Sequence, residues 1–152
     1  LYLVNIIYSN KLKSTPVFDI LIVGLWGALF VALVPGITFS LGLTAGLMTV
    51  IAHVFQILDD KQTDKRNGVL TTAVALPKQM GLILILLCVT LGAYVAIQIN
   101  YWWCAGAFLP VAAYYLSGRV HFSWYLARLY FVAVWLNILI IQYGGIKLPS
   151  IS

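Results

Sequence analysis

Long apolar runs separated by short loops are the feature that most constrains the fold of this chain. A helix of about 20 apolar residues crosses the hydrocarbon core of a bilayer, which is about 30 Å thick. Only 9% of the residues are charged, against roughly 25% in soluble domains. The sequence therefore predicts an all-α fold, a polytopic transmembrane helical bundle. Its five predicted spans cover about residues 16–33, 39–58, 79–98, 102–116 and 122–143.

The distribution of basic residues predicts the orientation of these spans. Seven bases fall in segments that share one side of the membrane, and only Lys147 follows the last span. Cytoplasmic loops carry an excess of Lys and Arg. This rule places the seven bases in the cytoplasm and accounts for the net charge of +5 without a nucleic-acid partner. The seven are Lys11, Lys13, Lys61, Lys65, Arg66, Lys78 and Arg119.

The segment from Asp59 to Arg66 concentrates three acids and three bases in a chain that otherwise avoids charge. If the second span continues as a helix through this segment, Asp60 and Asp64 lie one turn apart on the same face, with Cβ atoms roughly 5–6 Å apart. Asp59 then points about 100° away. His53 and Gln56 lie on nearly the same face as the two carboxylates, toward the membrane.

Two carboxylates at this spacing suit Mg²⁺, which prefers one or two carboxylates together with substrate phosphates and water. The opposing interpretation is a solvated cytoplasmic loop whose acids offset the neighbouring bases. His53 likewise has two interpretations, a helix-packing hydrogen bonder or a functional residue. The two cysteines, Cys88 and Cys104, lie in apolar runs without metal-binding spacing, and we expect buried thiols.

Two segments resemble one family. Asp60-x-x-x-Asp64, followed by "KRNGVLTTAVAL", resembles the second aspartate-rich motif of the UbiA superfamily of intramembrane prenyltransferases. "YSNKLKSTPVFD", residues 8–19, is similar to the "YSxxLKxxPxxD" segment that follows the fourth helix of that family. The five spans match the last five of the family's nine. The resemblance implies that residues 1–152 are the C-terminal portion of a single membrane-embedded prenyltransferase domain.

The resemblance also implies an activity, in which a polyprenyl group passes from a polyprenyl diphosphate to a small acceptor within the membrane. Asp60 and Asp64 would bind Mg²⁺ and the diphosphate, at an active site that faces the cytoplasm. Lys13 would contact the diphosphate and assist its departure. Further contacts to substrate are expected from Tyr8, Lys65 and Arg66, and His53 is a candidate on the acceptor side.

One departure from the family is large. Its first motif, NDxxDxxxD, is absent from this sequence. The chain also opens on "LYLVNIIYSN", which is typical of the exit end of a spanning helix. We therefore expect the C-terminal part of a longer protein, which is inactive on its own.

The sequence does not distinguish among several acceptors: an aromatic quinone precursor, a chlorophyllide, a carotenoid, a haem and a glycerol phosphate. Phosphoribosyl transfer onto a polyprenyl phosphate is a variant within the same superfamily. A second hypothesis is a non-catalytic structural subunit of a larger membrane assembly, in which His53 or His121 ligates a pigment metal. A transporter finds less support, because few ionisable residues lie at membrane depth.

The topology can be tested by cysteine-accessibility labelling in a cysteine-free background. The distribution of bases predicts that cysteines placed at Lys65 and Arg119 react with a membrane-impermeant reagent from the cytoplasmic side. A cysteine at Lys147 should react only from the opposite side. Labelling of Lys65 and Lys147 positions from the same side would contradict this topology.

Overall fold

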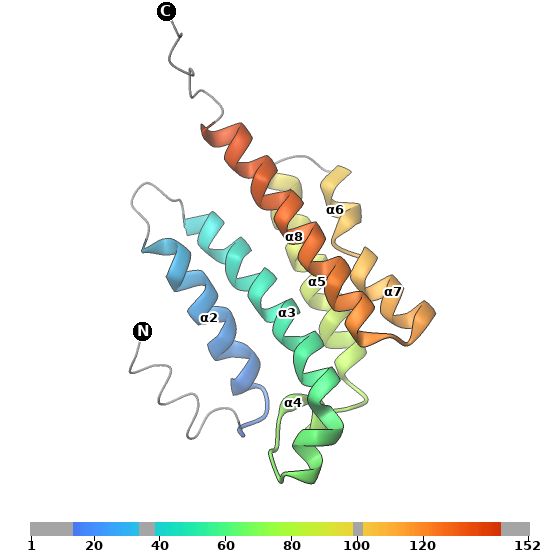
Figure 1. The fold of residues 1–152 in the computed structure, drawn as a ribbon. Coiled ribbons are helices and arrows are strands. Elements are labelled where there is room, and N and C mark those ends of the chain that lie inside the picture. Colours follow the sequence, from blue (N-terminus) through green and yellow to red (C-terminus); the bar gives the residue numbers. More distant parts are fainter. Residues whose placement is uncertain (1–13, 34–38, 99–101, 144–152) are drawn as a thin grey trace, which may run out of the picture.

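The computed structural model describes residues 14–33, 39–98 and 102–143, and every regular element in these ranges is a helix (Figure 1). This confirms the predicted all-α class for the described part of the chain. The helices are α2 (Phe18–Ala32), α3 (Phe39–Arg66), α4 (Thr72–Ala75), α5 (Met80–Gln98), α6 (Trp102–Gly106), α7 (Leu109–Ser117) and α8 (Val120–Tyr143).

The long helix α3 lies at the centre of the bundle. It contacts α2 along one side and α5 and α8 along others, and the short helix α4 packs near its C-terminal end (Figure 1). The side chains buried between these helices are almost all apolar, with Phe55, Leu41 and Ile51 of α3 among the largest. Burial of this apolar surface is the main favourable term in packing the helices together.

The helix lengths agree with some of the predicted spans and not with others. Within the described residues, α3 and residues 80–97 of α5 are each long and apolar enough to cross a membrane, by length and composition. Helix α2 has 15 residues, fewer than the 17–25 of a typical spanning helix. The prediction of five full spans is therefore met in part.

The fourth predicted span, residues 102–116, is not one continuous helix. It consists of two helices, α6 and α7, with two residues between them. Pro110 is the second residue of α7. Proline has no N–H to donate, and its ring clashes with the carbonyl four residues earlier, here that of Gly106. A proline at this place begins a new helix more readily than it continues an old one.

The second predicted span extends eight residues beyond its predicted end at Leu58, because α3 continues to Arg66. It ends in a Schellman motif, in which the N–H of Val69 bonds the carbonyl of Asp64 at 2.9 Å. Gly68 adopts a φ of 70°, the left-handed conformation that this motif requires. The second predicted span thus continues as a helix through the charged segment, which is the condition for Asp60 and Asp64 to share a face.

Helices α2 and α3 approach at backbone distance because small residues face one another. An added Cβ at Gly46 of α3 would lie 2.8 Å from the carbonyl oxygen of Gly24 and 3.0 Å from the Cβ of Ala28. Gly42 and Gly46 form a G-x-x-x-G pair, the spacing by which apolar helices pack closely in membranes. This contact fixes α2 against one face of α3.

The start of α2 is tied to α4 by a buried carboxylate. Asp19 is 1% exposed, and its Oδ2 accepts a hydrogen bond from the backbone N–H of Thr72 at 2.8 Å. The Thr72 hydroxyl donates to Oδ1 of the same carboxylate and accepts from the backbone N–H of Val17 at 2.7 Å. The Asp19–Thr72 contact therefore links segments 53 residues apart in the chain.

Substitution of Gly46 by alanine tests the close packing of α2 on α3. The added methyl meets backbone and Cβ atoms that cannot move independently, so we expect the free energy of unfolding to fall by about 1–3 kcal/mol. Unfolding in mixed micelles by titration with SDS measures this change.

Gly81→Ala is the matched control, because the added methyl there meets only the hydroxyl end of the exposed Tyr115 side chain, which can rotate away. Alanine is also the better helix former. Equal losses of stability in the two variants would contradict the role of Gly46.

Candidate functional site

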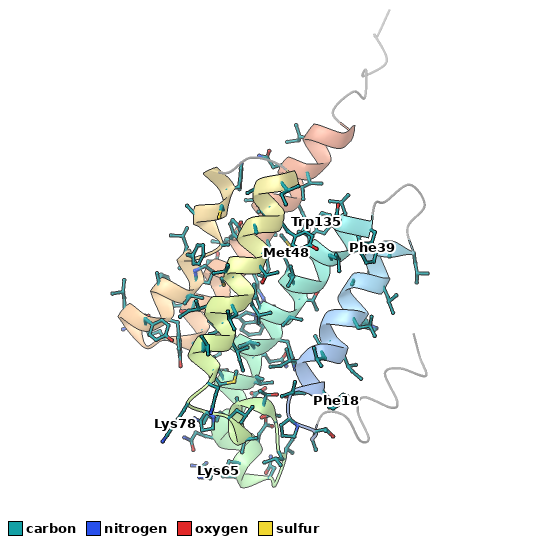
Figure 2. The ribbon with its side chains drawn as sticks, turned by 180° about the vertical axis from the view of Figure 1, so that it is seen from behind. Phe18, Phe39, Met48, Lys65, Lys78 and Trp135 are labelled. Atoms are coloured by element: carbon teal, nitrogen blue, oxygen red, sulfur yellow. The ribbon has the colours of Figure 1, made fainter. Side chains whose placement is uncertain are left out.

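The candidate site lies at the end of the bundle where α3 stops and α4 packs. Figure 2 shows Lys65 and Lys78 at this end, whereas Met48 and Trp135 lie toward the opposite end of the bundle. The charged residues at the end of α3 and the apolar residues further back are thus separated along the helix axis.

Asp60 and Asp64 lie one turn apart on α3, as the helical phase predicts. Asp60 is exposed, whereas Asp64 is only 8% exposed. In the described part of the chain no group donates a hydrogen bond or forms an ion pair with the Asp64 carboxylate. Its oxygens are not among the buried side-chain atoms that lack a hydrogen-bond partner, so they reach the surface of the bundle and are accessible to a cation.

Asp59 has a different environment from Asp60 and Asp64. Its Oδ2 lies 3.3 Å from Nε2 of His121, at the start of α8. The pair connects α3 to α8 across the mouth of the bundle. Sequence reasoning separated Asp59 from the other two carboxylates by helical phase but did not identify His121 as its partner, because no local spacing relates residues 62 positions apart.

The remaining predicted residues divide into three groups. Lys65 and Arg66 are exposed in the last turn of α3. His53 is buried on α3, two turns before Asp60, in agreement with its predicted face. Tyr8 and Lys13 lie outside the described residues.

An apolar pocket of about 430 Å³ opens between α2, α3 and α8. Aromatic side chains of Trp26, Phe30, Phe131 and Trp135 form its walls, and small α3 residues form its floor. Pockets of 300–1,000 Å³ with mainly apolar walls are typical of small-molecule sites. The volume and lining suit a flexible apolar ligand.

The floor of this pocket continues toward the carboxylates along one face of α3. Ala45, Thr49 and Ala52 line the pocket, and the exposed Gln56 follows Ala52 by four residues. Asp60 follows Gln56 by another four. Residues four apart lie on the same face of a helix, so the apolar floor leads through Gln56 to the first carboxylate.

Helix α8 forms the opposite wall with a matching sequence of side chains. Trp135 and Phe131 line the pocket, and Arg128, Trp124 and His121 follow on the same face toward the charged end. The Arg128 guanidinium carbon lies 3.8 Å from the centre of the Trp124 ring. The wall thus changes from aromatic to cationic as it approaches the carboxylates of α3.

Two carboxylates, Asp60 and Asp64, are the available ligands for a divalent cation here. Within the described residues no group of three or more His, Cys, Asp or Glu side chains is close enough to hold a metal by protein ligands alone. The donor set fits an Mg²⁺ ion that takes its remaining ligands from phosphate oxygens and water. It does not fit a metal held entirely by protein.

No family model, no curated protein and no solved structure matches this chain. The interpretation of the site therefore depends on its own geometry and chemistry.

Proposed function

We propose that this chain is part of a membrane-embedded prenyltransferase, which transfers a polyprenyl group from its diphosphate to a small acceptor. The observation that carries the proposal is the pair of carboxylates Asp60 and Asp64, one turn apart on α3 at the charged end of the bundle. Further along the same helix, α3 lines an apolar pocket with α2 and α8. A polyprenyl diphosphate has the same distribution of charged and apolar parts.

We propose that the helical bundle is embedded in a lipid bilayer. Large apolar side chains are exposed along the outer faces of α2, α5 and α8, and a contiguous apolar surface of this extent is unusual on a soluble monomer. We propose that α2 and the α6–α7 pair cross the membrane together with α3, α5 and α8. The charged end of α3 then lies at the cytoplasmic surface, where the basic residues gather.

The distance between the pocket and the carboxylates also supports a chain-like substrate. Ala45 and Asp60 are 15 residues apart on α3, which corresponds to about 22 Å along the helix axis. A diphosphate at Asp60 and Asp64 would extend its isoprenoid chain past Gln56 into the pocket between Trp26 and Trp135. The aromatic walls would bury the chain and exclude water.

The proposed reaction begins with heterolysis of the bond between the first prenyl carbon and the diphosphate oxygen. The diphosphate keeps the bonding electron pair, and an allylic carbocation is left. A nucleophilic carbon or oxygen of the acceptor then bonds to that carbon and releases a proton. Asp60 and Asp64 would hold Mg²⁺, which neutralises charge on the leaving diphosphate. The apolar pocket protects the cation from attack by water.

The alternative is a structural subunit with His53 or His121 as a pigment ligand. Nε2 of His121 faces the carboxylate of Asp59, which leaves Nδ1 for a metal. We give preference to the enzyme because the paired carboxylates Asp60 and Asp64 suit a metal-bound diphosphate.

Alanine substitutions at the three neighbouring acids test the proposal. In the intact protein, Asp60→Ala and Asp64→Ala should each lower turnover by more than about 100-fold, because each removes charge stabilisation of several kcal/mol at the leaving group. Asp59→Ala should be much milder, since it removes only a partly exposed contact to His121. Product formation from labelled prenyl diphosphate and Mg²⁺ measures all three.

Asp64→Asn is the shape-matched variant for the buried position. If it folds and inserts normally, retained turnover would exclude a cation-binding role for Asp64. Equal losses at Asp59, Asp60 and Asp64 would contradict the argument from helical phase.

Lys13→Ala tests the proposed basic contact to the diphosphate, and Lys11→Ala is its internal control. Both lysines contribute to topology in the same way, but only Lys13 falls on the "LK" pattern of the resembled segment. Lys13→Ala should lower both affinity for the diphosphate and turnover per inserted molecule, with Lys11→Ala nearly normal. Equal activities of the two variants would remove Lys13 from the site.

A further inference from the structure

We propose that Arg128 binds the phosphate of an anionic phospholipid whose acyl chains lie along the outer face of α8. The outer face of α8 consists of four side chains that are each more than half exposed: Tyr125, Val132, Leu136 and Ile140. The inference rests on the proposed bilayer around the bundle and not on prenyl transfer. It assigns a lipid partner to a residue that the proposed reaction does not use.

Arg128 lies well inside the helix that carries it. It is the only Lys, Arg, Asp or Glu of α8, and it follows the first residue, Val120, by eight residues, about 12 Å along the axis. Helix α8 begins at the end of the bundle where α3 stops, since His121 contacts Asp59 there (Figure 1). This is the cytoplasmic end in the proposed orientation. The backbone of Arg128 is thus placed below the membrane surface, where a guanidinium needs a polar partner.

The guanidinium of Arg128 is turned back toward the membrane surface. Its central carbon lies 3.8 Å from the centre of the Trp124 ring, which belongs to a residue four positions nearer the start of the helix. Helical side chains lean toward the helix N-terminus, and long basic side chains in membranes extend in this way toward the headgroups. The guanidinium is thus about 6 Å closer to the surface than its own backbone. Stacking on the indole holds it at that level.

The acidic residues of the chain do not neutralise Arg128. The sequence has four of them, all in the described ranges, and none forms an ion pair with Arg128. Asp59, the acid that contacts α8, faces His121 instead. A zwitterionic phospholipid carries its own cation beside the phosphate, whereas an anionic phospholipid brings a net negative charge. The balance of charge therefore favours an anionic headgroup, whose phosphate can accept two parallel hydrogen bonds from a guanidinium.

Arg128 lies at the border between the pocket wall and the outer face of α8. At about 100° per residue, Trp124 lies about 40° from Arg128 on the side of the pocket residues Phe131 and Trp135. Val132 lies about 40° from it on the other side. Because Arg128 is itself exposed, a lipid phosphate can reach it from the outer face without entering the pocket.

The outer face of α8 provides the apolar contacts that such a lipid needs. Val132, Leu136 and Ile140 follow Arg128 at intervals of four residues, a spacing that keeps side chains on one side of a helix. From Arg128 to Ile140 is about 18 Å along the axis, comparable with one leaflet of a hydrocarbon core about 30 Å thick. Tyr125 lies three residues on the surface side of Arg128, at the level where tyrosines meet headgroups. Headgroup, phosphate and acyl chain thus meet suitable side chains in the order in which a lipid presents them.

Lipid binding to the intact protein in uncharged detergent micelles tests the inference. Native mass spectrometry measures the affinities for phosphatidylglycerol and phosphatidylcholine with identical acyl chains. Wild-type protein should prefer phosphatidylglycerol. Arg128→Gln should weaken phosphatidylglycerol binding by about 10- to 100-fold, the range for hydrogen bonds to a charged group. Phosphatidylcholine binding should change much less, so the variant should no longer distinguish the two lipids.

Arg119→Gln is the matched control. Arg119 is an exposed base one residue before α8, and it adds the same charge to the same end of the helix. At about 0.15 M salt such a charge is screened, so the preference for phosphatidylglycerol should remain. Arg128→Lys keeps the charge but lacks the planar pair of donors, and an intermediate loss is expected. If circular dichroism shows that Arg128→Gln does not fold, wild-type affinity in Arg128→Lys contradicts the inference.

Three results would overturn the inference. The first is equal affinity of the wild-type protein for the two lipids. The second is an equal loss in Arg128→Gln and Arg119→Gln, which would show a general attraction between charges and no site. The third is displacement of phosphatidylglycerol by inorganic phosphate or by diphosphate with Mg²⁺, which would place Arg128 in the site of Asp60 and Asp64.

Farnesyl diphosphate with Mg²⁺, titrated in the same micelles, separates this inference from the proposed function. Asp64→Asn should lose the affinity for the diphosphate and retain the preference for phosphatidylglycerol. A wild-type protein that binds farnesyl diphosphate but does not prefer phosphatidylglycerol contradicts the lipid site alone. A wild-type protein that shows the preference, dependent on Arg128, but binds no farnesyl diphosphate contradicts the prenyltransferase alone.

Discussion

The unbroken hydrogen-bonded helix of α3 is the constraint on which the rest of the structure depends. Because α3 runs from Phe39 to Arg66 without interruption, its helical phase at the apolar end determines which side chains lie on the same face at the charged end. Ala45 and Ala52 in the pocket, Gln56 at the middle and Asp60 at the mouth follow from one continuous rotation of 100° per residue. A proline or a bulge between them would separate the apolar pocket from the carboxylates.

Two different contacts hold α2 against this helix. Near the middle, Gly24 and Gly46 have no side chains, so the two backbones lie closer together than a methyl group would allow. This close approach adds dispersion contacts along the interface. At its start, α2 is held by the Asp19–Thr72 contact, in which a buried carboxylate is satisfied by a backbone N–H, a hydroxyl and its own neighbouring N–H on Ile20. Together they position Trp26 and Phe30 as one wall of the pocket.

The few charges of this chain have separate roles. The carboxylate of Asp19 accepts hydrogen bonds from Thr72 and so has a structural role. Asp59 faces His121 across the end of the bundle. Within the described residues neither Asp60 nor Asp64 forms an ion pair, and Arg128 of α8 stacks on Trp124. The two carboxylates of α3 are therefore available to the proposed cation and its diphosphate.

The all-helical class, the approximate helix positions and the shared face of Asp60 and Asp64 can be predicted from the sequence, because they depend on apolar content and helical period. The G-x-x-x-G spacing of Gly42 and Gly46 and the proline at position 110 are also local signals, of close packing and of a helix break. The burial of Asp64 beside the exposed Asp60 and the contact of Asp19 with Thr72 become visible only in the folded chain. These features depend on which helices pack together and in what register. Contacts between residues tens of positions apart produce no periodic pattern in a single sequence.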